Sequence, residues 1–446
     1  MEIHIKESTI VRPAKDTPKH RLWISDLDLF MATYHVSLVY FYQQPTDCSN
    51  FFDAGILKEA LSNALVPFYP IAGRLGWNES GRLEISCNAE GVLFLMAETD
   101  SVIDDLGDFT PSSQLQQLVP AVDYTKDITS HPLLVLQVTY FKCGGACLGV
   151  GFHHTLADGT STLHFINTWA DMARGFPMTS TPLIDRTIVR ARVPPSPSFH
   201  HTEYDPPLSM NNPTQIKEFQ CSPVPTSVAT LKLSLDQIDT LKASVKKDHL
   251  GTDINYSTYE VLAAHIWRCM CRARKLPSTQ ASKFYISMSG RSRLNPPIPS
   301  TYFGNVIFFT TPIALSGDIQ SEQLIFTVER IRKAVKQMDN KYLTSALAYL
   351  RQHHDVTTLR HGPHNCRSPN LKLVSWVNLP LYDADFGWGR PVSMGLANVI
   401  IGGISFILPN STGDGSLSLV ICLETHQMEL FKKFFYEFQL ALRGKM

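Results

Sequence analysis

The sequence predicts two domains in which α-helices pack on β-sheets, an α/β or α+β architecture. At 446 residues the chain is too long for one ordinary core, because domains seldom exceed roughly 200 residues. Strand-like and helix-like segments alternate along both halves. A polar, proline-rich stretch without periodicity separates the halves at residues 194–225. We therefore expect an N-terminal domain at residues 1–190, an extended surface linker at 191–226 and a C-terminal domain at 227–446.

The first half contains several clear elements. Residues 36–42 form a β-branched and aromatic run that is typical of a strand. Residues 52–65 are amphipathic and precede Pro67, so they predict a helix that ends there. Residues 133–141 predict a further strand, and the glycine pair that follows suits a hairpin turn into the next strand.

The segment 152–159 is predicted to connect the end of that hairpin to a helix. Thr160, Ser161 and Thr162 offer N-cap oxygens, and apolar residues then recur at helical spacing until Gly175, a candidate C-cap. A histidine at such a junction is held by rigid elements and can face a cleft. That position suits a general base.

The second half repeats the alternation of strands and helices. Its predicted strands are residues 229–233, 284–289, 306–314, 372–377, 405–408 and 416–423. Its predicted helices are residues 235–246, 258–274, 323–341 and 426–442.

Composition narrows the functional classes. Lys plus Arg and Asp plus Glu both number 40, so no net charge favours nucleic acid or an anionic membrane. No apolar run approaches the roughly 20 residues of a membrane-spanning helix, and the charged N-terminus does not resemble a secretory signal. The nine cysteines form no CxxC pair, which disfavours a metal site or a disulfide framework. A cytoplasmic protein is expected.

Two short motifs carry chemistry. His154 and Asp158 form an HxxxD pattern, which alone is weak because a packed core histidine would fit equally well. Residues 385–389 read Asp-Phe-Gly-Trp-Gly, where two glycines allow close backbone approach around an aromatic anchor. In isolation each motif favours a structural interpretation.

Together, in this order and separation, the two motifs resemble those of the plant BAHD acyl-CoA-dependent acyltransferases. The resemblance covers the whole chain and is greatest to the hydroxycinnamoyl-CoA shikimate/quinate transferase branch. It rests on residues 8–14, 65–75, 302–305 and 383–391. It implies an α/β fold with mixed sheets, made of two chloramphenicol-acetyltransferase-like domains with an active-site channel between them. It also implies a monomer that uses acyl-CoA as co-substrate, without a tightly bound cofactor or metal.

The resemblance implies roles for individual residues. His154 would be the general base, since neutral imidazole titrates in the right range, and the indole N–H of Trp388 would stabilise the oxyanion. Asp158 would hold the turn by pairing with Arg291 or Arg293, and Asp385 would be structural rather than a proton carrier. Gly159, Gly387 and Gly389 would be motif residues that shape the backbone. The residues implied for CoA binding are Asn255, Tyr256, Ser257, Thr258, Ser289, Gly290, Arg291, Ser292, Arg293, Ser375 and Trp376.

The expected acceptor pocket departs from the branch. It comprises His35, Val36, Leu38, Tyr40 and Asn378. The branch has hydroxyl-bearing or polar residues where this chain has Val36 and Leu38, and an arginine that grips the acceptor carboxylate where it has Asn378. A desolvated guanidinium–carboxylate pair contributes about 2–5 kcal/mol, which an amide cannot replace. We therefore expect an acceptor other than shikimate or quinate.

Three alternatives stay open at this point. The acceptor could still be shikimate, quinate or a hydroxyphenyllactate, as in rosmarinate-type members. A thioesterase-like hydrolase could use the same histidine on water. A non-catalytic protein could bind a phenolic ligand, although such a binder needs neither His154 nor Trp388.

Overall fold

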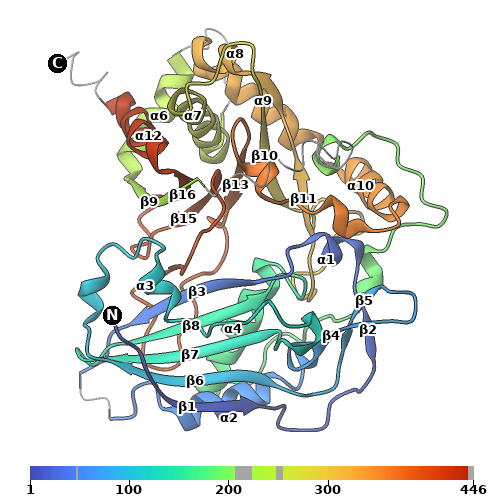
Figure 1. Cartoon of the computed structure of the whole chain (residues 1–446), viewed down its shortest axis with the longest axis vertical. Coiled ribbons are helices and arrows are strands. Elements are labelled where there is room, and N and C mark those ends of the chain that lie inside the picture. Colours follow the sequence, from blue (N-terminus) through green and yellow to red (C-terminus); the bar gives the residue numbers. More distant parts are fainter. Residues whose placement is uncertain (47–48, 206–223, 248–254, 440–446) are drawn as a thin grey trace. The chain divides into compact units, whose positions relative to one another are not determined.

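The structure is a computed structural model, drawn in Figure 1. It describes residues 1–46, 49–205, 224–247 and 255–439. The chain forms two compact units, each made of separate stretches of sequence. Unit 1 comprises residues 1–192, 296–306 and 379–398, and unit 2 comprises residues 193–295, 307–378 and 399–446.

Unit 1 contains a six-stranded sheet with the order β1-β6-β7-β8-β3-β14. These strands are β1 (His4–Val11), β6 (Val92–Thr99), β7 (Leu134–Phe141), β8 (Ala146–His153), β3 (His35–Tyr42) and β14 (Ser393–Leu396). A smaller sheet joins β2 (Arg21–Trp23), β5 (Leu83–Ser86) and β4 (Arg74–Trp77). The helices are α1 (Asp26–Phe30), α2 (Ala54–Ala64), α3 (Ser113–Gln116) and α4 (Gly159–Ala173).

Alternation along β3 divides its side chains between two different surroundings. Tyr42 faces the helical side, where Phe52 and Phe386 surround its ring and Phe386 packs on Trp169 of α4. Val39 and Phe41 belong to a separate apolar cluster that includes Leu115, Leu118 and Val119. Both faces of the central strands are therefore buried, which explains their nearly continuous apolar sequence.

Unit 2 is built on a mixed sheet with the order β11-β10-β13-β15-β16-β9, in which β12 also pairs with β10. Its strands are β9 (Thr226–Leu233), β10 (Ala281–Ser289), β11 (Ile307–Thr310), β12 (Ile313–Leu315), β13 (Leu371–Ser375), β15 (Ile404–Pro409) and β16 (Leu417–Glu424). Its helices are α6 (Leu235–Lys247), α7 (Thr258–Ala273), α8 (Ser316–Ser321), α9 (Leu324–Gln337), α10 (Asn340–Gln352), α11 (Pro363–Cys366) and α12 (Thr425–Tyr436).

Two predicted elements in the second half of the chain are interrupted in the structure. The helix expected at 323–341 ends at Gln337 as α9, and α10 was not predicted. The chain breaks there because Asp339 is the N-cap of α10 and accepts a hydrogen bond from the Tyr342 amide. The single strand expected at 306–314 divides into β11 and β12, which pair with different parts of β10.

The division into units also differs from the predicted domains. Residues 379–398, expected in the C-terminal domain, belong to unit 1 because β14 pairs with β3. Residues 296–306 belong there too, and Asn305 hydrogen-bonds to Asp28. The predicted linker is not simply an extended surface segment, since His201 is fully buried in unit 2. Its central part, residues 206–223, lies outside the described residues.

Candidate active site

The HxxxD turn connects the end of β8 to the start of α4. His153 is the last residue of β8 and is fully buried, whereas His154 is half-buried. The amide of His154 donates to the Tyr34 carbonyl at 3.1 Å, and the Leu156 amide donates to the His153 carbonyl at 2.9 Å. The backbone on both sides of His154 is thus fixed by rigid elements, as a general base requires.

Asp158 is the N-cap of α4, whereas the sequence pointed to Thr160, Ser161 and Thr162 for this role. Its Oδ1 accepts from the Ser161 amide at 3.1 Å, and its Oδ2 accepts from the Val306 amide at 2.9 Å. The carboxylate therefore ties the turn to the Val306 backbone. The expected pairing with Arg291 or Arg293 stays a prediction, because those arginines belong to unit 2.

The DFGWG loop lies in unit 1 as well. Oδ1 of Asp385 accepts from the amides of Gly387 at 2.8 Å and Gly389 at 3.0 Å, and both glycines have positive φ. Two backbone amides held by one carboxylate oxygen fix the conformation of the loop. This geometry agrees with a structural role for Asp385.

Trp388 does not lie where an oxyanion donor is needed. Its ring packs on Phe52 at a centroid distance of 5.1 Å, and Phe52 packs on Tyr42 at 4.6 Å. Tyr42 pairs with Ala146, whereas His35 pairs with His153, and β3 rises roughly 23 Å between those levels at about 3.3 Å per residue. An oxyanion donor must lie about 3 Å from the developing charge. The role expected for Trp388 is therefore not supported by its position, since it lies toward the opposite end of the sheet from His154.

Four of the predicted acceptor residues lie on β3, whereas Asn378 belongs to unit 2. Val36, Leu38 and Tyr40 share one face, while His35 faces the other way, because strand side chains alternate. The ring nitrogens of His35 are already occupied, Nδ1 by the Tyr124 hydroxyl at 2.7 Å and Nε2 by the Pro132 carbonyl at 2.8 Å. Burial lowers the pKa of His35 to about 4. The hydrogen bonds of the His35 ring therefore indicate a structural role, which the sequence did not reveal.

Tyr40 differs from His35 in its bonding. Its side chain is fully buried, and within the described part of the chain its hydroxyl has no hydrogen-bond partner. Burial raises the pKa of this phenol, so it stays protonated. A buried hydroxyl without a partner typically costs about 1–3 kcal/mol, which a polar group of a bound molecule could recover.

The residues expected to bind CoA all belong to unit 2. Ser289 ends β10 and Ser375 ends β13, and these two strands are parallel neighbours. The segments 289–293 and 375–376 therefore leave the same edge of the sheet, the edge at which mixed and parallel sheets commonly bind ligands. Ser257 caps α7, but the Tyr256 hydroxyl is bonded to Glu329 and the Arg293 guanidinium to two carbonyls of residues 335 and 338.

A different cluster in unit 2 has the connectivity of a hydrolytic triad. Nε2 of His201 lies 2.9 Å from Oγ of Ser345, and Nδ1 lies 2.9 Å from Oε1 of Glu203. All three side chains are buried, and Oγ of Ser345 also accepts from the amides of Ser198 and Phe199 at 2.8 and 3.0 Å. A nucleophile whose lone pairs are engaged in this way cannot attack a substrate. The cluster attaches the 198–205 segment to α10.

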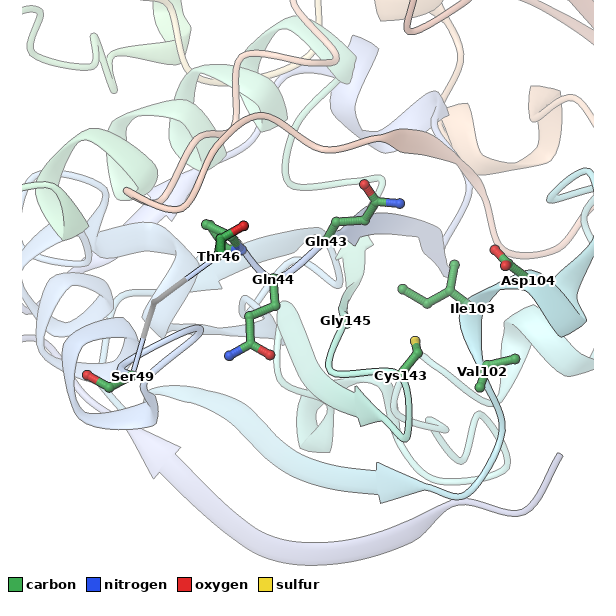
Figure 2. Close-up of a pocket in the computed structure, with 10 residues that line it drawn as sticks. Gln43, Gln44, Thr46, Ser49, Val102, Ile103, Asp104, Cys143 and Gly145 are labelled. Carbon is green, nitrogen blue, oxygen red and sulfur yellow. The ribbon is translucent and has the colours of Figure 1, made fainter.

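Figure 2 shows a pocket of about 870 Å³ at the other end of the unit 1 sheet. It is lined by the segment that follows β3, including Gln43 and Gln44, and by the β7–β8 turn at Cys143. None of the predicted site residues line it. Among the described residues, no three His, Cys, Asp or Glu side chains are grouped as a metal site would require. Over the same residues, no helix has the length and apolar character needed to cross a membrane.

Comparisons with known proteins identify the class. The model of the Transferase family matches residues 1–438, and the chain belongs to this family, the BAHD acyltransferases. It is thus an acyl-CoA-dependent acyltransferase with a two-domain α/β fold. It is 54% identical to shikimate O-hydroxycinnamoyltransferase of Nicotiana tabacum, over 98% of this chain and 100% of that protein.

One further relative and one solved structure show the breadth of the resemblance. Hydroxycinnamoyl-CoA:5-hydroxyanthranilate N-hydroxycinnamoyltransferase HHT4 of Avena sativa is 47% identical, over 97% of this chain and 99% of that protein. The solved structure of F. graminearum TRI101 complexed with coenzyme A and T-2 mycotoxin has a TM-score of 0.76 at 17% identity, and the alignment covers 92% and 96% of the two chains. The latter likeness concerns the fold alone.

Proposed function

We propose that the chain transfers a hydroxycinnamoyl group, of the coumaroyl or caffeoyl type, from CoA to a hydroxyl or amine, with His154 as general base. The observation that carries this proposal is the turn itself: His154 is half-buried between β8 and α4, next to a histidine that is fully buried. Relatives that transfer hydroxycinnamoyl groups to an oxygen and to a nitrogen acceptor support the donor class and leave the acceptor atom open.

In the proposed reaction His154 removes the proton of the acceptor as its oxygen or nitrogen attacks the thioester carbonyl. The tetrahedral intermediate collapses with cleavage of the carbon–sulfur bond. The imidazolium then returns the proton to the departing CoA thiolate. The CoA portion is assigned to unit 2, to residues 255–258, 289–293 and 375–376.

The acceptor is proposed to lack the carboxylate of shikimate and quinate. Val36 and Leu38 make the helix-facing side of β3 apolar. The Tyr40 hydroxyl, which has no hydrogen-bond partner among the described residues, supplies a polar group there. Asn378 replaces the guanidinium that would pair with a carboxylate. A phenol, an aromatic alcohol, an amine or a glycoside would suit such a surface better than a polyhydroxylated acid.

An acceptor panel with coumaroyl-CoA and caffeoyl-CoA, read by mass spectrometry of the products, tests this assignment. We expect the highest turnover with an acceptor that has no carboxylate. Asn378→Arg should raise turnover on shikimate or quinate, and Asn378→Gln is the matched control because it lengthens the side chain without adding charge. Unchanged shikimate turnover in Asn378→Arg would count against the carboxylate argument.

Shikimate or quinate remains a second candidate acceptor, favoured by the 54% identity to the Nicotiana tabacum transferase. The same panel separates the two candidates. If wild-type protein prefers shikimate or quinate over every neutral acceptor, the second candidate is correct.

A further inference from the structure

A buried carboxylate lies behind the HxxxD turn. Asp28, in α1, is fully buried, and its Oδ2 accepts from the amide and hydroxyl of Ser25 at 2.8 and 2.7 Å. The same oxygen pairs with Nη1 of Arg186 at 3.0 Å. Oδ1 accepts from both the backbone amide and the side-chain amide of Asn305, each at 2.8 Å. We call Ser25, Asp28, Arg186 and Asn305 the Asp28 hub.

Two members of the hub extend to the turn that carries the base. Nδ2 of Asn305 donates to the His154 carbonyl at 3.0 Å, and Nη2 of Arg186 donates to the Leu156 carbonyl at 2.7 Å. Asp28 therefore orients the two donors that hold the carbonyls on either side of Thr155. Ser25 bonds to Asp28 and to the Leu29 amide, within its own α1 segment.

The carbonyls of the turn need hydrogen-bond donors, but they do not need donors that are attached to a buried ion pair. Any neutral donor could satisfy a buried carbonyl, whereas a fully buried ion pair has a desolvation cost that its attraction only partly offsets. A rigid ionic centre, however, allows little displacement of the donors attached to it. A misplacement of about 1 Å at a reacting group can reduce turnover by roughly 100-fold.

We propose that Asp28, acting through Asn305 and Arg186, is a positioning group that fixes the orientation of His154 during acyl transfer. The inference rests on the proposed function of His154 as the base. Asp28 does not touch the substrate; it sets the backbone from which the imidazole projects.

Asn305→Ala is the main test, because it removes the bond to the His154 carbonyl while keeping the Asp28–Arg186 pair and the backbone amide of residue 305. We expect kcat to fall by about 10- to 100-fold, while KM for coumaroyl-CoA stays within about twofold. The acceptor is the one with the highest turnover in the panel. Ser25→Ala is the matched control: it removes the two bonds between the Ser25 hydroxyl and Asp28, and it should lower the thermal midpoint without lowering kcat.

A double-mutant cycle separates positioning from general destabilisation. In a His154→Ala background Asn305→Ala should cause no further loss of turnover, because there is no imidazole left to orient. An equal loss in both backgrounds would overturn the proposal, as would a kcat for Asn305→Ala equal to that of Ser25→Ala. If Asn305→Ala does not fold, Arg186→Lys replaces it, since lysine keeps the charge beside Asp28 but cannot also hold the Leu156 carbonyl. A wild-type kcat in that variant would likewise overturn it.

The outcomes also distinguish this inference from the proposed function. Full turnover in the single variant His154→Ala would contradict both the role of His154 as base and the positioning role of Asp28. An inactive His154→Ala together with an unimpaired Asn305→Ala would remove the positioning role alone.

Discussion

The two ends of the β3–β8 strand pair are stabilised by different kinds of interaction. At the end where His35 pairs with His153, a polar turn is held by buried charges and amides. At the end where Tyr42 pairs with Ala146, the DFGWG loop is held by aromatic rings and by one carboxylate. The two motifs that together indicate the family therefore lie at opposite ends of one sheet.

The largest effect is expected from His154, the proposed base. His154→Ala should lower turnover by about 10²- to 10⁴-fold, because no other group would remove the acceptor proton. His153→Asn is the control at the adjacent residue, and it should retain far more activity. CoA release from coumaroyl-CoA in the presence of acceptor measures both variants. Near-normal turnover in His154→Ala would mean that another group serves as the base.

The second prediction concerns Trp388, at the opposite end of the sheet from His154. Trp388→Ala should lower the free energy of unfolding by about 3–5 kcal/mol, because a buried indole is removed from the Phe52 cluster. Trp388→Phe keeps an aromatic ring but removes the N–H. We expect it to change kcat by less than about fivefold, whereas loss of an oxyanion donor would cost about 10²- to 10³-fold. Chemical denaturation and steady-state kinetics give the two values.

A pH effect on stability is expected from the His154 end. Burial lowers the pKa of His35 to about 4, while the unfolded chain binds its proton near pH 6.5. Between these values the unfolded state binds more protons, so stability present above pH 6.5 is lost as the pH falls toward 4. His35 should contribute a loss of about 2 kcal/mol between pH 7 and pH 5.

Urea unfolding at the two pH values measures this loss as the difference between wild type and His35→Gln. Tyr42→Phe, at the other end of the strand, is the control. Its phenol has a pKa raised by burial and is neutral in both states, so the variant should keep the wild-type pH dependence. An identical pH dependence in wild type and His35→Gln would show that His35 titrates normally in the folded protein.

The smallest effect is expected within the DFGWG loop. Asp385→Asn keeps the oxygen that accepts from Gly387 and Gly389, so it should cost less than about 1 kcal/mol of stability. Asp385→Ala leaves both amides without that partner and should cost about 1–3 kcal/mol. Thermal unfolding compares the two variants. Equal stabilities would indicate that the loop does not depend on these bonds.

Local sequence patterns predicted the strands and helices in which apolar residues form a continuous run or recur at a regular spacing. The apolar runs of β3 and β7 and the helical spacing of α4 and α7 were sufficient to place them within a few residues. β14 was missed because it is four residues long, contains a glycine, and exists through pairing with a strand some 350 residues earlier. The break between α9 and α10 was missed because apolar spacing continues across the capping residue Asp339.

The HxxxD motif of the candidate site could be predicted from the sequence, whereas most of the residues that surround the motif could not. His154 follows from its position between a strand and a helix, and the period-two alternation of a strand is sufficient to place His35 and Val36 on opposite faces. The Asp28 hub had one local signal, the capping pattern of Ser25 and Asp28. Its links to Arg186 and Asn305 depend on tertiary packing, which no local pattern encodes.

The discontinuity of unit 1 has a consequence for how the protein is made. Asn305 and the edge strand β14 are encoded long after the rest of that unit. During synthesis, the first 192 residues emerge without the amide that completes the bonding of Asp28 and with β3 paired on one side only, to β8. Unit 1 therefore cannot reach its final form on the ribosome until residue 398 has been added, although domains generally fold in order from the N-terminus. A nascent chain arrested before that point should be sensitive to proteases at β3.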